Sequence, residues 1–404
     1  MWTGIPNLRH LRAFSEVAAT GSVTEAARRI HLTQPAISQA LSRLEERVGA
    51  PLFEQGANRM VLTTAGTMFA PRVTRALDFL SHGAREVRRI AGQRSKGGFA
   101  SFDHLLTIAQ LNALSAMAEA GNFSLAARAS GLSQPSIHRA ARDLERLTGV
   151  TLFEKTSQGV ELTRAAAALA QQAQLARAEL KQGLAEIGEA LGVDAGRIVI
   201  GSLPLARSSV LPNAINRFCL ERPHTDISIV EGPYDTLLHA LRHGEIDLII
   251  GALREPAPIG DVEETALFSD TLCVAARARH PLARKDRLSL FDLAAFPWAI
   301  APVGAPTRSY FDLLFKDREQ GIAAGLIEAS SLVLLRGLLA DSDRLTIISG
   351  HQIMHEVRQG LLTILPFALD GSDRRIGLTT RRGWRPTPTQ SLFLDSLRAA
   401  AEAA

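Results

Sequence analysis

The 404-residue chain has few cysteines, no long apolar stretch and no recognisable secretory signal. Cys219 and Cys273 are too few for a disulfide framework or a cysteine-rich metal site, so each is interpreted as a small buried side chain. No apolar run approaches the roughly 20 residues that a membrane-spanning helix needs. The first residues lack the charged start and apolar centre of a secretory signal. These absences favour a cytoplasmic protein.

Motifs of common enzyme classes are also missing. The chain has no phosphate-binding G-x-x-x-x-G-K loop, no G-x-G-x-x-G after an expected strand, no H-E-x-x-H and no G-x-S-x-G. Its 11 histidines show no metal-ligand spacing, and His280, which precedes Pro281, is typical of a turn. We therefore expect no enzyme and no bound metal or cofactor.

Charge is distributed unevenly along the chain. The formal net charge is +4, but residues 1–100 hold 14 Lys and Arg against 7 Asp and Glu, or +7, which leaves −3 for the remaining residues. A basic N-terminal part predicts a polyanionic partner, for which nucleic acid is the first candidate and a solvated basic helix is the alternative explanation. Much of the excess follows residue 70, in Arg72, Arg75, Arg85, Arg88, Arg89, Arg94 and Lys96.

Residues 8–64 and 108–164 match each other without a gap, at an offset of 100 residues. They are identical at 21 of 57 aligned positions, and both contain Ala-Ala-Arg, Gln-Pro, Leu-Glu, Leu-Phe-Glu and Leu-Thr in the same order. A unit of this length is a duplicated domain, since solenoid repeats are shorter and more numerous. The length and the 46% hydrophobic content predict about two to four globular domains in total.

Each copy has the pattern of three helices. Apolar residues at three-residue intervals mark a first helix, which Gly21 and Gly121 end. A short second helix is expected over residues 24–30 and at the matching place in the second copy. Thr33 and Ser133 then cap a third helix that has proline in its first turn.

The third helix of the first copy has an apolar face and a polar face. The polar face has amide and hydroxyl groups near its start and a basic group further along, which suits the major groove of DNA. The second copy offers different groups on this face, so we expect the two copies to contact different bases. The predicted contacts are Thr24, Thr33, Gln34, Pro35, Ala36, Ser38, Gln39, Ser42, Arg43, Arg59 and Thr63 in the first copy, and Ser133, Gln134, Pro135, Ser136, His138, Arg139, Arg142, Lys155 and Thr163 in the second.

Two short strands are expected after each third helix. They lie near residues 52–54 and 60–62 in the first copy, and near 152–155 and 160–162 in the second. A wing of this kind lies along the DNA backbone or the minor groove, where Arg59 or Lys155 can meet phosphate.

The order AAxxxxLxQPxxSxxxxxLE, followed by G, LFE and LT, resembles the winged helix-turn-helix of LysR-type transcriptional regulators. The first copy has all of these residues, and the second has His138 in place of the serine. The family usually has a basic residue after Leu-Phe-Glu; Lys155 provides it, whereas Gln55 does not. The family also ordinarily has one such domain per chain. The resemblance implies a sequence-specific DNA-binding regulator.

Other interpretations of the two domains stay open. A helical bundle that binds protein gives a similar pattern, and the second copy fits it better than the first, because its six Lys and Arg face five Asp and Glu. The second copy is then a protein-interaction module. An architectural protein that bridges DNA and binds no ligand is a further alternative. A metabolite that shifts the melting temperature separates a sensor from such a bridging protein.

Residues 164–191 have leucine and isoleucine spaced for one long helix. The resemblance makes this segment the linker helix through which two chains pair, and a solvent-exposed spacer is the alternative. Residues 70–90, after the first copy, are a candidate counterpart helix. A flexible joint follows at Gly92, Ser95, Gly97 and Gly98.

From residue 197 strands alternate with helices, which implies a parallel sheet. The segments GRIVIGS, VEGPYDTLLHALRHGEIDLIIGALRE and ARHPLA resemble the effector-binding domain of the same regulators, which is built like a periplasmic binding protein with a cleft between two α/β lobes. We expect mainly α winged helix-turn-helix domains at residues 1–66 and 101–165, a helical connector and flexible joint at 67–100, a dimerisation helix at 166–193 and the α/β effector-binding domain at 194–404.

Ligands of open α/β sheets bind beyond the carboxyl ends of the strands, near helix N-termini. Hydroxyl groups there can hydrogen-bond a carboxylate and Arg308 can pair with it, which predicts a small organic anion as effector; ordinary loop caps are the alternative. The other expected partners are double-stranded promoter or operator DNA, RNA polymerase, and further chains in a homodimer or homotetramer. A dimer presents four winged helices, as a tetramer of single-copy chains does. The predicted effector contacts are Ser202, Leu203, Pro204, Pro233, Tyr234, Gly251, Thr307, Arg308, Ser330 and Ser331.

Overall fold

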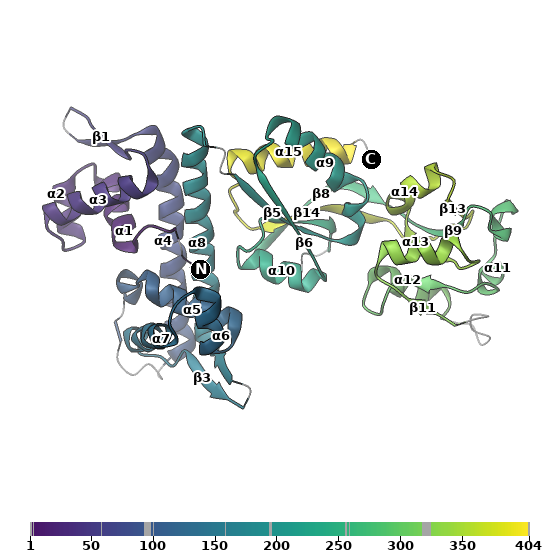
Figure 1. Ribbon diagram of the computed structural model, residues 1–404, viewed down its shortest axis with the longest axis horizontal. Helices are drawn as coiled ribbons and strands as arrows, with labels where there is room; N and C mark the ends of the chain where they lie inside the picture. The colour runs from purple at the N-terminus through teal and green to yellow at the C-terminus, as the bar shows by residue number, and fades with distance from the viewer. Residues whose placement is uncertain are drawn as a thin grey trace. The chain divides into compact units, whose positions relative to one another are not determined.

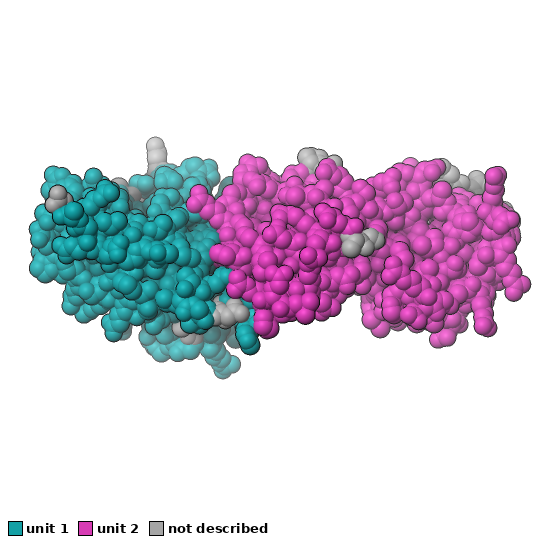
Figure 2. Space-filling view, turned by 90° about the horizontal axis from the view of Figure 1, so that it is seen from above, with its two compact units in different colours: residues 1–197, 224–226, 242–245 teal, residues 198–223, 227–241, 246–404 magenta. Residues whose placement is uncertain are grey.

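The structure, a computed structural model, describes residues 2, 4–57, 59–92, 98–99, 101–157, 159–193, 196–254, 257, 259–316 and 325–402. The chain divides into two compact units, shown in different colours in Figure 2: residues 1–197 with 224–226 and 242–245, and the other residues from 198 to 404. Within the described residues, no helix combines the length and the apolar character that a bilayer crossing requires. Ser95 and Gly97 of the predicted joint, and Arg94 and Lys96 of the predicted basic excess, lie outside the described residues.

The first unit contains both copies of the repeat, each with three helices and a two-stranded wing (Figure 1). These elements confirm the predicted helices and strands. The first copy consists of α1 (Leu8–Thr20), α2 (Val23–Arg29), α3 (Gln34–Val48), β1 (Phe53–Gln55) and β2 (Met60–Leu62). The second consists of α5 (Ile108–Ala120), α6 (Phe123–Ser130), α7 (Gln134–Thr148), β3 (Phe153–Thr156) and β4 (Gly159–Leu162), preceded by the short 3-10 helix η2 (Phe102–Leu105).

The predicted helix ends have a direct physical cause. Gly21 and Gly121 adopt φ of 67° and 60°, the left-handed conformation that closes a helix without a Cβ clash. Their carbonyl groups accept hydrogen bonds from the backbone N–H of Met60 (2.9 Å) and Val160 (3.1 Å). The end of each first helix therefore also positions the second strand of its own wing.

Two long helices of the first unit lie side by side and antiparallel (Figure 1): α4 (Thr64–Ala91) and α8 (Arg164–Ala190). A Cβ added to Gly83 would lie 3.0 Å from Gln172 Cβ, and one added to Gly183 would lie 2.9 Å from Arg72 Cβ. The predicted linker helix thus packs on a helix of its own chain. This excludes the solvent-exposed spacer, because α4 covers one face of α8; the pairing of α8 with a second chain stays a prediction.

The first lobe of the second unit is a three-layer α/β structure. The sheet order is β6-β5-β7-β14-β8, and α9 (Val210–Glu221) and α15 (Pro388–Glu402) share one core with Ile198 and Ile200, whereas α10 (Tyr234–Arg242) packs with Val199. β5 and β7 are parallel, but β14 is antiparallel to β7 and β8, so the predicted parallel sheet is in fact mixed. The strands are β5 (Arg197–Ser202), β6 (Asp226–Glu231), β7 (Leu248–Ala252), β8 (Val262–Asp270) and β14 (Arg374–Arg381).

The second lobe surrounds the antiparallel sheet β12-β9-β13. Trp298, Phe311 and Leu345 are central to its core. The lobe contains β9 (Leu272–Arg277), α11 (Leu290–Ala294), β10 (Ala299–Ile300), α12 (Pro306–Leu314), β11 (Ile327–Glu328), α13 (Leu332–Ala340), β12 (Thr346–Ser349), α14 (Gly350–Arg358) and β13 (Leu362–Ile364).

A buried carboxylate marks the place where the chain passes from the first lobe to the second. Asp270, at the end of β8, accepts hydrogen bonds from Ser349 Oγ (2.6 Å) and Arg374 Nε (2.8 Å) and contacts His351 Nδ1 (2.8 Å). Asp270 and Arg374 are also register partners where β8 ends and β14 begins. Groups from both lobes thus meet on one carboxylate at the crossing, so that its charge is compensated although it is buried.

Candidate nucleic-acid interface and ligand site

The predicted contacts of the first copy lie on the outward side of α3, on α2 and on the wing. Ile37, Leu41 and Leu44 are buried in the core, which turns the polar face of α3 to solvent. The predicted contact residues are exposed, except Ala36 and Thr63, which are half-buried. Amide, hydroxyl and guanidinium groups are therefore available on one helix face, as major-groove contacts require.

The corresponding face of α7 is also exposed but carries different chemistry. His138, Arg139 and Arg142 are exposed; Arg142 Nη1 donates to Glu145 Oε2 (3.0 Å), and the His138 ring lies 5.1 Å from the Phe123 ring centroid. Because Arg142 and His138 have partners within their own copy, Arg139 is the better candidate for a base contact.

Four predicted contacts are capping residues. Thr33 Oγ1 accepts a hydrogen bond from the N–H of Ala36 (3.4 Å), and Ser133 plays the same part in α7. Thr63 Oγ1 accepts from Gly66 N–H (3.0 Å) at the start of α4 and donates to a backbone carbonyl (2.7 Å), and Thr163 repeats this pattern at α8. The hydroxyl groups of Thr63 and Thr163 thus have a role in the fold, and their assignment as DNA contacts stays a prediction.

The wings depend on a glutamate that sequence reasoning did not single out. Glu45 Oε1 accepts hydrogen bonds from the N–H groups of Leu52 (2.7 Å) and Phe53 (3.2 Å), and Glu145 does the same in the second copy (2.9 and 3.1 Å). The identical Leu-Glu pair in both copies was the signal. This bond holds β1 or β3 against its third helix and leaves Arg59 and Lys155 exposed on the wings.

Part of the predicted basic excess is neutralised inside the first unit. Arg72 is buried and pairs with Glu179 (3.0 Å) and Glu186 (2.5 Å) of α8. Arg75 also pairs with Glu179 (2.9 Å), and Arg89 pairs with Glu86 (2.7 Å), whereas Arg85 and Arg88 are exposed. Assigning Arg72 and Arg75 to a polyanion was therefore wrong, because their partners are carboxylates of the same chain.

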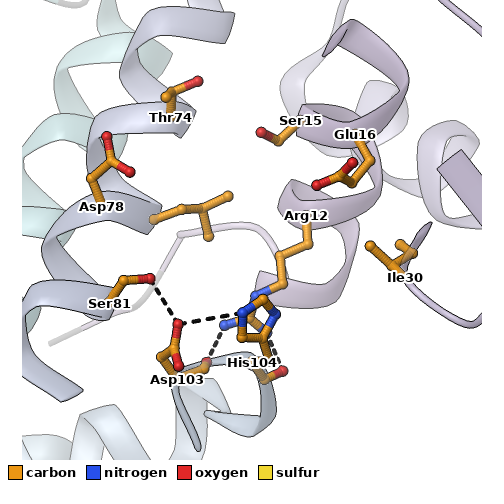
Figure 3. Close-up of a pocket in the computed structure, with 10 residues that line it drawn as sticks. Arg12, Ser15, Glu16, Ile30, Thr74, Asp78, Ser81, Asp103 and His104 are labelled. Carbon is orange, nitrogen blue, oxygen red and sulfur yellow. Dashed lines mark hydrogen bonds and ion pairs between the residues drawn. The ribbon is translucent and has the colours of Figure 1, made fainter. Parts of the chain in front are cut away.

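A cavity of about 200 Å³ lies between α1, α4 and η2 (Figure 3). Arg12 extends from α1 and donates to the backbone carbonyl groups of Asp103 and His104, and the Asp103 carboxylate accepts from Ser81 Oγ of α4 at 2.7 Å. Burial lowers the pKa of Arg12, against the charge of Asp103, which raises it. These contacts fasten the start of the second copy to the first copy and to α4.

The predicted ligand residues of the first lobe gather at the carboxyl ends of β5 and β7. Ser202 is buried at the end of β5, and a Cβ added to Gly251 of β7 would lie 2.5 Å from Leu203 Cβ. Tyr234 begins α10 beside this edge, and Arg254 Cζ lies 4.2 Å from its ring centroid. Pro204 and Pro233 flank the same positions in the chain.

Arg254 was missed because it follows β7 without a recognisable motif. Burial raises the pKa of Tyr234, and the charge of Glu264 raises it further, so the phenol stays protonated at neutral pH and can donate a hydrogen bond. A stacked guanidinium beside a protonated phenol suits a carboxylate ligand.

The predicted residues of the second lobe lie at the starts of α12 and α13. Arg308 Nε donates to Asp312 (2.7 Å), and Arg308 Nη1 donates to Glu328; these hydrogen bonds raise the pKa of Arg308. Ser331 Oγ accepts from Leu334 N–H (3.3 Å) as a cap. Two carboxylates therefore already contact Arg308, and the loop-cap alternative is correct for Ser331. Thr307 and Ser330 adjoin them in sequence.

Known proteins match the chain along nearly its whole length. The family model described as LysR substrate binding domain matches residues 192–402, and the one described as bacterial regulatory helix-turn-helix protein, lysR family, matches twice, at 8–67 and 108–167. The HTH-type transcriptional regulator GalR of Pseudomonas putida strain KT2440 is 33% identical over 396 residues, which cover 98% of this chain and 97% of that protein.

Solved structures share the fold over part of this chain. ArgP from Mycobacterium tuberculosis matches with a TM-score of 0.56 and 17% identity, over 72% of this chain and 96% of its own. LysG from Corynebacterium glutamicum, solved with bound effector Arg, matches with a TM-score of 0.52 and 17% identity, over 73% and 97%. Nearly all of each solved chain thus corresponds to less than three quarters of this one.

Proposed function

Since the chain belongs to the LysR family of bacterial transcriptional regulators, we propose that it reads duplex DNA with both of its winged helices and responds to a small organic anion held by its α/β lobes. The observation that carries this proposal is the pair of exposed faces on α3 and α7, each supported by the same capping and wing contacts.

The proposed base contacts are the exposed side chains in the first turns of these two helices. Gln39 has the geometry to bond adenine with two hydrogen bonds, and Arg139 has the geometry to bond guanine. Arg59 and Lys155 on the wings contact phosphate, which adds affinity without sequence preference.

For the anion, Arg254 is the proposed cation of the first lobe, with Tyr234 and Ser202 as hydrogen-bond donors. Arg308 and Thr307 are the proposed contacts of the second lobe, where the anion competes with Asp312 and Glu328 for the guanidinium group. The proposal includes no catalytic step. It places the protein in the cytoplasm. There, several chains assemble on operator DNA, and RNA polymerase is the downstream partner.

The DNA proposal is tested by footprinting the full-length protein on its own promoter region, beside full-length variants Gln39→Ala and Arg139→Ala. We expect a protected site that shortens or weakens at one end for each variant. An unchanged footprint with Arg139→Ala would instead make the second copy a protein-interaction module. No protection at low ionic strength contradicts the proposal as a whole.

The effector proposal is tested by calorimetry of the full-length protein with a panel of mono- and dicarboxylates. Arg254→Ala and Arg308→Ala should each weaken the binding of a carboxylate, and Arg398→Ala, which removes an exposed cation of α15, is the matched control. No binding across the panel, or binding that neither variant changes, overturns the organic-anion assignment.

A further inference from the structure

The helix pair α4–α8 has an internal two-fold symmetry. Gly83 of α4 faces Leu169 and Gln172 of α8, and Gly183 of α8 faces Phe69 and Arg72 of α4. The two contacts are related by the offset of the repeat: residues 83, 169 and 172 of the first contact correspond to residues 183, 69 and 72 of the second. This exchange of positions is what an interface between two identical subunits shows, although here both helices belong to one chain.

We infer that a single chain forms the complete two-headed DNA-reading module by itself, and that its binding site consists of two half-sites of different sequence. The inference rests on the proposed function, since it requires that both winged helices contact DNA. The inference goes beyond the proposed function in two respects. The symmetric helix pair forms within one polypeptide, and the two half-sites of the operator differ in sequence.

The path of the chain supports pairing within one polypeptide. Asp103 of η2, which follows α4 in the sequence, accepts a hydrogen bond from Ser81 Oγ of α4 at 2.7 Å. Near the start of the chain, the backbone N–H of Trp2 donates to Asn112 Oδ1 of α5 at 2.8 Å, and Trp2 is 1% exposed. One hydrophobic core then continues from α1 through α4 and α8 to α5 and α7. The two copies are therefore parts of one folded unit, connected by a short segment.

The polar contacts of the helix pair break its symmetry. Arg72, which is 4% exposed, donates to Glu179 (3.0 Å), Gln182 (3.0 Å) and Glu186 (3.2 and 2.5 Å). At the symmetry-related position stands Gln172, which has no charge. Burial lowers the pKa of Arg72, but the hydrogen bonds and charges of Glu186 and Glu179 outweigh it and leave this pKa raised.

This asymmetry selects α4–α8 pairing over pairing of like helices. Two α8 helices would place Glu179 and Glu186 opposite Gln172 and bury carboxylates without a cation. Two α4 helices would place Arg72 opposite Phe79 in place of Glu179, but would keep a carboxylate, Glu86, in the place of Glu186. An uncompensated buried charge is costly, so the cluster acts most strongly against pairing of two α8 helices, whereas pairing of two α4 helices loses one of the two carboxylate partners of Arg72.

The two-fold relation carries over to DNA recognition, because the backbone of duplex DNA has local two-fold axes. Related recognition helices contact related half-sites, as dimeric helix-turn-helix proteins do. Their outward side chains differ at several matched positions, so the bases contacted in the two half-sites differ. These pairs include Ser38 and His138, Gln39 and Arg139, Ser42 and Arg142, and Arg43 and the half-buried Asp143.

The chain topology is tested by disulfide trapping in the full-length protein. Gly83→Cys with Gln172→Cys places two Cβ atoms about 3.0 Å apart, so a small outward shift of the helices brings them to the separation of about 3.5–4.5 Å that a disulfide needs. Burial and the charge of Asp270 raise the pKa of Cys273 to about 12, which keeps that native thiol unreactive at pH 8. We expect an intrachain bond, seen as a monomer of altered mobility on a non-reducing gel. Each single variant is the control.

Co-expression of a Gly83→Cys chain with a differently tagged Gln172→Cys chain provides the complementary arm. Crosslinked heterodimers, together with no intrachain bond in the double variant, overturn the inference and leave the proposed DNA binding intact.

The operator is tested with sites selected from random DNA by the full-length protein. We expect selected sites with two unlike half-sites, and a preference of about tenfold or more over probes that contain either half-site twice as an inverted repeat. Equal binding of an inverted repeat overturns the inference. A protein that selects no DNA at all contradicts the proposed function instead, so the two failures are distinguishable.

Discussion

The two winged helix-turn-helix domains have the same internal contacts and different outward faces. Gly21 and Gly121 end the first helices, and Glu45 and Glu145 hold the wings through equivalent hydrogen bonds. The exposed turns of α3 and α7 share few side chains beyond Gln-Pro. The residues that end the first helices and hold the wings are thus the same in both copies, whereas the side chains on the outward faces differ.

The long helices differ in the opposite sense, because their difference lies in the interior. α4 contributes a buried guanidinium, and α8 contributes the carboxylates that surround it. The pair is symmetric in shape and asymmetric in charge.

The largest expected effect comes from breaking that asymmetry. Arg72→Gln gives α4 the side chain of the related position in α8, leaves Glu186 buried without a cation and leaves Glu179 with Arg75 as its remaining cation. We expect it to destabilise the N-terminal unit by about 3–5 kcal/mol, measured by urea unfolding followed through hydrogen exchange of α4. Gln172→Ala is the matched control, with a loss below about 1 kcal/mol. Equal losses of unfolding free energy in the two variants would show that the buried cluster contributes no more to stability than Gln172 does.

The next effect sharpens the difference between the recognition helices. Replacing His138, Arg139, Arg142 and Asp143 by Ser, Gln, Ser and Arg gives α7 the outward face of α3. We expect the preferred probe to change from two unlike half-sites to an inverted repeat of the first, by roughly 10- to 100-fold in Kd, measured by fluorescence anisotropy. A variant that folds and keeps the original preference would show that these four positions do not read bases.

The wings should behave alike, in contrast to the recognition helices. Arg59→Ala and Lys155→Ala each remove one phosphate contact, so binding to cognate and random DNA should weaken together. The slope of log K against log salt should become shallower by about 1 in each case. Gln55→Ala, which removes no charge, is the control for the first wing. A change of sequence preference in either cationic variant contradicts this assignment.

The smallest effect is a pH dependence confined to the first copy. Burial lowers the pKa of His10, and the nearby charge of Arg43 lowers it further; the second copy has Gln110 at this place. In the unfolded chain the imidazole has a pKa of about 6.5, so below that pH the unfolded state binds a proton that the folded state resists. The contribution to stability is therefore present above about pH 6.5 and is lost as the pH falls.

A comparison of melting curves at pH 7.5 and 5.5 tests this point. His10→Gln should remove part of the pH dependence of the melting temperature. The same pH dependence in wild type and variant contradicts the role of His10.

Local sequence signals predicted the local structure well. Gly21, Thr33, Ser133 and their counterparts place the helix ends within a residue or two, because capping depends on side chains next to the helix terminus. Alternating apolar residues likewise located β5 and α9. The exposed face of each recognition helix followed from the buried face alone.

Features that depend on distant partners were not predictable. Arg72 was counted among the cations for a polyanion, but it contacts Glu179 and Glu186, which lie on another helix of the same chain. The strands β8 and β14 were not predicted, because nothing in their sequence indicates that the chain returns to the first sheet. The mixed pairing of that sheet was therefore not predicted either. The partner of α8 could not be deduced, because its apolar stripe fits a helix of another molecule as well as α4.

The covalent union of α4 and α8 also changes how such a regulator can evolve. In an assembly of identical polypeptides, every codon change in a recognition helix alters both arms of the operator together. With the operator arrangement proposed above, a mutation in α7 affects one arm of the operator, while the contacts of α3 with the other arm stay unchanged. Promoter and protein can then diverge one operator arm at a time, without an intermediate that fails to bind both arms.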